Sequence, residues 1–181
     1  MNIHTFKLWA RYHLWATHRL SISLHTVSDE DFAKDCGLFF KSILGTLNHL
    51  LLAEHELWFS RFSKGESPAI ALNSVIETDR HRLLERLLQS AGQWQSFIKE
   101  LNQEALDGVL HYRNTRGQDL SLPYAATLMH VFNHATHHRG QITAAMTALD
   151  YASPELDMLF MLMEEQQAVT LSILILLMYQ T

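Results

Sequence analysis

The chain has 181 residues and a mass of 20.9 kDa, which suits one globular domain with a core of useful size. Apolar residues make up 48% of it and charged residues 18%, a composition that excludes an intrinsically disordered chain. The formal net charge of −5 argues against a broad basic surface, so we expect no nucleic-acid partner.

Cysteine usage and the first residues bear on the cellular compartment. Cys36 is the single cysteine, so it forms no internal disulfide. We expect it to be a small buried apolar residue in a reducing cytoplasm, with a nucleophilic role as the alternative. The opening "MNIHTFKLWARYHLW" lacks the basic start and apolar run of a secretory signal. The predicted location is therefore cytoplasmic.

Helical patterns occupy the first third of the chain. Residues 5–25 carry apolar side chains close to every 3.6 residues, which predicts a first helix. Ser28 and Asp31 are spaced as a cap for a short helical turn. A second helix is predicted from about 38 to 62, where leucines recur, and "SKGESP" ends it with a glycine and a proline.

The remaining elements are a third helix, a hairpin and two further helices. Residues 75–102 have one charged side and an apolar stripe, which predicts the third helix. Turn residues within 108–122 predict a short hairpin. Pro123 suits the first position of a fourth helix running to about 149, and Ser153 with Pro154 suits the start of a shorter fifth.

These elements predict an all-α fold in which four main helices form a bundle. Residues 1–181 are treated as a single domain, with a core of about 1–165 and an apolar C-terminal extension at 166–181. Bundles commonly hold metal ions between facing helices.

The last residues, "AVTLSILILLMYQT", are strongly apolar. Their uninterrupted run is shorter than the about 20 residues that a membrane-spanning helix needs, and we expect no membrane partner. We interpret 168–181 as a helix or extended segment packed on the body or on a second subunit, with a tail anchor as the alternative.

Four histidines lie within "HVFNHATHHRGQI", residues 130–142. Side chains four residues apart on a helix have Cβ atoms about 5–6 Å apart, so His134 and His138 could share one ion. His130 extends that stripe by one turn, whereas His137 lies about 100° further round the helix. The alternative is that the histidines are solvated or simply hydrogen-bonded.

A metal site needs a third ligand from another helix, and His49 is the candidate. It lies among leucines in "LGTLNHLLLAEHELWF", and Gly45 leaves room one turn earlier. In an α-helix Glu54 and His55 turn to other faces, so Glu54 is expected to be a supporting or structural side chain. The alternative for His49 is a core histidine with ordinary partners. The other histidines show no usable mutual spacing: His4, His13, His18, His25, His81 and His111.

The two segments "LNHLLLAEHELWFSRF" and "HVFNHATHHRGQI" resemble the DinB family within the DinB/YfiT-like superfamily. "RYHLWATHRL" is similar to the first helix of that family and "ASPELDMLFML" to its usual ending, so the resemblance reaches about residue 165. It implies an up-down-down-up four-helix bundle, commonly dimeric, with a divalent-metal site at His49, His134 and His138. Arg139, Gly140 and Gln141 complete the motif.

Two departures from the family pattern stand out. Thr17 and His18 occupy positions where an asparagine commonly follows the Trp-Ala pair, which affects the expected pocket lining. The apolar tail after Glu165 is an addition, which leaves the dimer arrangement open.

Three imidazoles leave coordination positions open, and an ion there can lower the pKa of bound water or thiol. The superfamily includes enzymes that use low-molecular-weight thiols. The resemblance therefore implies a metal-dependent thiol S-transferase acting on an electrophilic substrate, with a hydrolase as its neighbour. Tyr12, Trp15, Trp58 and Glu54 are candidates for lining the pocket. Zinc or nickel is the first expectation for the ion, followed by iron, copper or manganese.

Two alternatives stay open. One is a non-catalytic, metal-binding stress-response protein, since the family name refers to DNA-damage induction. The other is a degenerate bundle that binds nothing. The sequence shows no dedicated general base, which is compatible with metal-activated thiol chemistry and with an absence of catalysis.

Overall fold

The structure, a computed structural model, describes residues 1–178 and consists mainly of helices. The elements in chain order are α1 (Ile3–Leu24), α2 (Asp29–Ala33), α3 (Ile43–Leu50), the π-helix η1 (Leu51–Phe59), α4 (Ser60–Lys64), α5 (Arg80–Glu100), α6 (Gln103–Asp107), β1 (Val109–Arg113), β2 (Asp119–Pro123), α7 (Tyr124–Ala148) and α8 (Met158–Met178).

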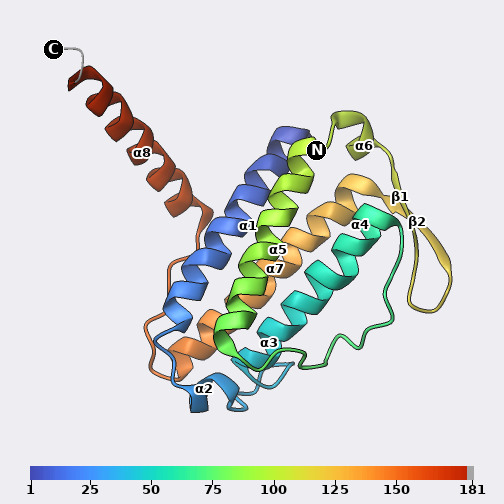
Figure 1. Ribbon diagram of the computed structural model, residues 1–181, viewed down its shortest axis with the longest axis horizontal. Helices are drawn as coiled ribbons and strands as arrows, with labels where there is room; N and C mark the ends of the chain where they lie inside the picture. The colour runs from blue at the N-terminus through green and yellow to red at the C-terminus, as the bar shows by residue number, and fades with distance from the viewer. Residues whose placement is uncertain (179–181) are drawn as a thin grey trace.

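Four long helical segments pack side by side as a bundle (Figure 1). They are α1, α5, α7 and the continuous rod formed by α3, η1 and α4, which we call the α3–α4 rod. Residues 65–79 return along the length of the bundle, so α5 runs in the same direction as the α3–α4 rod and opposite to α1 and α7 (Figure 1). The predicted up-down-down-up bundle is confirmed.

The apolar core fixes the α3–α4 rod against α7. Ile43, Leu47 and Leu51 of the rod are buried in the same cluster as Ile142 and Met146 of α7. Burial of a side chain of this size contributes about 1.5–3 kcal/mol. The packing of these five side chains therefore sets the distance between the two segments that carry His49 and the histidine pair.

Side-chain caps decide where several helices begin, and they shift two predicted boundaries. Ser28 accepts a hydrogen bond from Asp31 N, which confirms the predicted short turn. Ser42 caps α3, so this helix begins at Ile43 and not near 38. Asp79 likewise caps α5, which begins at Arg80 instead of 75. Such a cap contributes about 1 kcal/mol.

The predicted hairpin is confirmed as β1 and β2, which pair antiparallel with Tyr112 opposite Leu120. Gly117 has a φ of +77° in the turn, a conformation that favours glycine. Arg113 N donates to Gly65 O at 3.0 Å, which attaches the hairpin to the end of the α3–α4 rod.

The C-terminal helix is longer than the sequence pattern predicts. Its first turns lie on α1, where Met161 is buried beside Tyr12 and Ala16. Beyond them α8 extends away from the bundle (Figure 1), and Val169 and Leu171 are 59% and 60% exposed. The described part of the apolar extension therefore does not pack on the body, and residues 179–181 lie outside the described residues. Packing on a second subunit stays a prediction.

Among the residues that the structure describes, no helix is long and apolar enough to cross a membrane.

Deleting residues 168–181 is expected to leave the stability of the bundle unchanged, because the contacts that attach α8 to α1 precede this segment. Arg11 pairs with Glu165, and the Trp15 indole donates to Glu164. Deleting 158–181 is the matched control, since it also removes Met161 and should lower the thermal midpoint. Equal losses in both variants would contradict this. If a second copy covers the exposed apolar side chains, the shorter deletion also lowers the mass in solution.

Candidate metal centre

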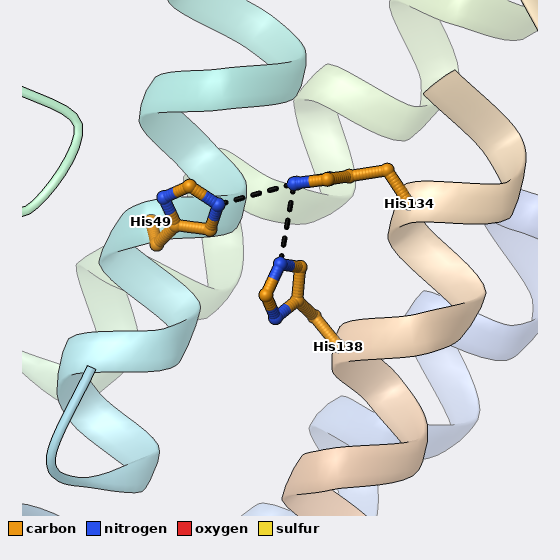
Figure 2. Close-up of side chains that lie close together, drawn as sticks. All are labelled: His49, His134 and His138. Carbon is orange, nitrogen blue, oxygen red and sulfur yellow. Dashed lines mark hydrogen bonds between the residues drawn. The ribbon is translucent and has the colours of Figure 1, made fainter. Parts of the chain in front are cut away.

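Three histidines from two segments meet between the α3–α4 rod and α7. His49 lies in the last turn of α3, and His134 and His138 lie one turn apart on α7 (Figure 2). His134 Nε2 is 3.1 Å from His49 Nε2 and 3.2 Å from His138 Nε2. One nitrogen of each ring lies within 4.8 Å of the other two, so the group could hold one metal ion. The site residues chosen from spacing are thus brought together.

The nitrogen separations fit a metal ion. Ligands at about 2.0–2.1 Å in tetrahedral geometry lie about 3.3–3.4 Å from one another. The observed 3.1 and 3.2 Å are close to that value. His134 Nε2 is therefore placed to share a cation with either of the other two rings, and one nitrogen of each ring lies within 4.8 Å of the other two.

The outer nitrogen of each ring faces an oxygen acceptor. His49 Nδ1 lies 2.9 Å from Leu72 O, and His138 Nδ1 lies 2.7 Å from the Gln141 Oε1. His134 Nδ1 lies 3.3 Å from Glu54 Oε1. Because oxygen acceptors require a proton on Nδ1, each Nε2 carries a lone pair directed at the other two. Three converging lone pairs repel one another, and a cation between them removes the conflict.

The surroundings favour the neutral form of His49 and His138, which is the form that binds metal. Burial, and next the neighbouring His134, lowers the pKa of His138 to about 4. Burial also lowers the pKa of His49, although the hydrogen bond to Leu72 O opposes the shift. Protons therefore compete weakly for His138 and His49 at neutral pH.

These shifts predict how the stability of the metal-free protein depends on pH. The pKa of His138 is about 4 in the folded state and about 6.5 in an unfolded chain. Its contribution to stability is therefore present above pH 6.5 and is lost as the pH falls through 4. We expect the thermal midpoint in chelator to drop over this range, with a smaller drop in His138→Gln. Parallel curves for both proteins would contradict the assignment.

A close backbone approach positions the ring of His49. The Phe40 ring stacks on it, with centroids 3.8 Å apart and an angle of 16° between the planes. Phe40 precedes α3, and a Cβ atom at Gly45 would lie 2.0 Å from Phe40 O. Glycine at position 45 therefore does more than leave room: it lets the Phe40 segment reach His49.

The π-helix changes which side chains face the site. In an α-helix, five residues turn the chain about 140° past one full turn, which would direct Glu54 away from the face of His49. The wider turns of η1, with hydrogen bonds five residues apart, bring Glu54 back toward α7. The expectation that Glu54 turns to another face was wrong. Its carboxylate contacts the outer nitrogen of His134, which agrees with the supporting position expected for this side chain.

His13 is a neighbour of the site that spacing among the histidines did not reveal. It is buried, with its Nε2 3.7 Å from Glu54 Oε2 and its Nδ1 3.1 Å from Arg139 Nη1. The signal was present, because His13 continues the apolar stripe that Phe6, Ala10 and Leu20 form along α1. A histidine on that stripe had to be buried with a polar partner.

Most of the predicted pocket-lining residues do not face the three histidines. Tyr12 donates its hydroxyl hydrogen to Leu156 O at 2.8 Å, and Trp15 donates to Glu164. Trp58 packs on His130, whose ring in turn lies 5.8 Å from the His134 ring. Of the four candidates, Glu54 is the one that contacts the cluster.

Sequence comparison places the chain in a known family, since the DinB family pattern matches residues 1–169. The chain belongs to the DinB family. Protein DinB of Bacillus subtilis (strain 168) is 29% identical over 163 residues, which cover 87% of this chain and 92% of that protein.

Two solved structures share the fold. A DinB-like protein from Bacillus cereus ATCC 10987 matches with a TM-score of 0.59 and 18% identity, over 78% of this chain and 90% of that one. YfiT from Bacillus subtilis also matches with a TM-score of 0.59, at 13% identity, over 80% and 87%. YfiT is described as a probable metal-dependent hydrolase with an unusual four-helix bundle topology.

Proposed function

We propose that His49, His134 and His138 bind one divalent cation at which the protein activates a small nucleophile. The observation that carries this proposal is the convergence of three Nε2 atoms, with an oxygen acceptor facing the opposite nitrogen of each ring. Zinc or nickel suits such an all-imidazole site, and iron, copper or manganese are alternatives.

A cation with vacant positions supplies Lewis acidity and makes a bound thiol or water more acidic. The chain's own residues hold the three rings in the required tautomer and orientation. Phe40 covers one face of His49 and approaches His138, so it shields one side of the cluster from water. The substrates would enter from the remaining side, where His134 is partly exposed.

A low-molecular-weight thiol is the first candidate nucleophile. Glu54 contacts the cluster at the outer nitrogen of His134, on the side away from the three Nε2 atoms, so it is poorly placed to deprotonate water at the open side. Thiol transfer does not require a general base from the protein. The thiol proton passes to solvent, the sulfur bonds to an electrophilic carbon, and the leaving group departs with its electron pair. Water is the second candidate, in keeping with the description of YfiT as a probable hydrolase.

The test is consumption of a small thiol in the presence of a model electrophile, with hydrolysis of an activated ester measured in parallel. Metal-loaded protein should accelerate thiol consumption, and chelator or His134→Ala should abolish the acceleration. Ester hydrolysis without thiol consumption would favour water. Metal binding without either reaction would favour the non-catalytic alternative.

A further inference from the structure

Three charged or ionisable side chains from three different helices meet behind His134, on the side away from the metal-binding nitrogens. They are His13 of α1, Glu54 of η1 and Arg139 of α7, and each is at most 4% exposed. Groups of this kind rarely occupy a core without a specific arrangement of partners.

The contacts form a chain that ends at a site histidine. The Arg139 guanidinium donates from Nη1 to His13 Nδ1 at 3.1 Å. Since Arg139 has only donors, His13 carries its proton on Nε2, which lies 3.7 Å from Glu54 Oε2. The other oxygen of Glu54 lies 3.3 Å from His134 Nδ1. The order is therefore Arg139, His13, Glu54, His134.

A cation and a carboxylate lie at different points along this series of contacts. Burial raises the pKa of the Glu54 carboxyl, and the contact with His134 and the nearby Arg139 cation both oppose that shift. The face of Tyr12 lies 5.4 Å from the Arg139 guanidinium carbon, and Thr136 Oγ1 accepts from Nη2 at 3.2 Å, so the cation has further partners. A carboxylate that accepts the Nδ1 proton of a histidine makes its Nε2 a better metal ligand.

We propose that Arg139 and His13 are positioning residues that hold the Glu54 carboxylate against His134 and thereby strengthen metal binding by that histidine. This inference rests on the proposed function, because it needs a cation at the three Nε2 atoms. The order of contacts implies that loss of the polar contacts of His13, on a different helix from every proposed ligand, weakens metal binding.

The first test is the zinc affinity of Glu54→Gln, measured by competition with a chelating dye. Glutamine has the shape of glutamate but lacks its charge, so we expect the dissociation constant to rise about 10- to 100-fold. The cobalt-loaded variant should also show shifted visible absorption bands. Ser90→Ala is the matched control, because Ser90 is buried in the wall of the same small cavity as Glu54 and His13, and its affinity should equal that of wild type.

A pair of substitutions at His13 separates positioning from packing. His13→Gln keeps an acceptor for Arg139 and an N–H group that can face Glu54, so it should retain most of the affinity. His13→Leu removes both contacts and should lose affinity as Glu54→Gln does. The thermal midpoints of the metal-free proteins are measured alongside. Equal affinities for the leucine and glutamine variants would overturn the positioning role.

The outcomes distinguish this inference from the proposed function. If the wild-type protein binds no metal, the proposed function and this inference are both contradicted. If wild type binds zinc and Glu54→Gln binds it equally well, the inference alone is overturned and the three-histidine site stands.

Discussion

Replacing His134 by alanine is expected to abolish stoichiometric metal binding. His134 Nε2 is the central nitrogen of the cluster, in contact with both His49 Nε2 and His138 Nε2. Its removal leaves two ligands and also removes the contact between His134 Nδ1 and the buried Glu54 carboxylate. Removal of groups that merely support a ligand weakens metal binding about 10- to 100-fold, so we expect loss of a ligand itself to exceed about 100-fold.

The measurement is elemental analysis of wild-type and His134→Ala protein after the same dialysis against a metal-containing buffer. His137→Ala is the control, because His137 is on the same helix and contacts the His138 ring but is not one of the three converging residues. Wild type and the control should retain one equivalent, and His134→Ala should retain none. Equal metal content in all three proteins would remove the proposed site.

Substituting Gly45 by alanine is expected to destabilise the protein, although alanine is the better helix former. The added Cβ would meet Phe40 O at 2.0 Å, and a backbone carbonyl cannot move aside cheaply. The segment before α3 must shift, which disturbs the stacking of Phe40 on His49 and the Ser42 cap. Overpacking of this kind costs about 1–3 kcal/mol, and the lost cap adds about 1 kcal/mol. Metal affinity should fall with stability.

Gly92→Ala provides the matched control. Gly92 lies within α5, and a Cβ there would meet no atom within 4 Å. Helix propensity alone should therefore make this variant more stable, by about 0.8–1.0 kcal/mol. Urea unfolding of the metal-free proteins measures both effects. A stabilised Gly45→Ala variant with unchanged metal affinity would contradict the role assigned to the close approach.

The local part of the site could be predicted from the sequence because helix geometry fixes it. His134 and His138 are one turn apart in any α-helix, and their i, i+4 spacing alone places the two rings together. His49 was harder to predict as a ligand, because its approach to His134 and His138 depends on how two distant segments pack. The leucines around it indicated the buried face of the second helix, and this was enough to choose it.

The contacts of Glu54 and His13 and the length of α8 could not be predicted from the 3.6-residue period of an α-helix. Glu54 reaches His134 because η1 departs from α-helical turns, and a pattern that assumes 3.6 residues per turn directs it elsewhere. Spacing among the histidines could not reveal His13, because its partners are a carboxylate and a guanidinium. The length of α8 was underestimated because its apolar end was interpreted separately from its start at Met158.

X-ray absorption spectroscopy of the zinc-loaded protein tests the metal centre most directly. The spectrum should show three imidazole ligands with nitrogen at about 2.0–2.1 Å and at least one further light ligand from solvent. A first shell with fewer than three imidazoles, or one unchanged by His49→Ala, would contradict the three-histidine site.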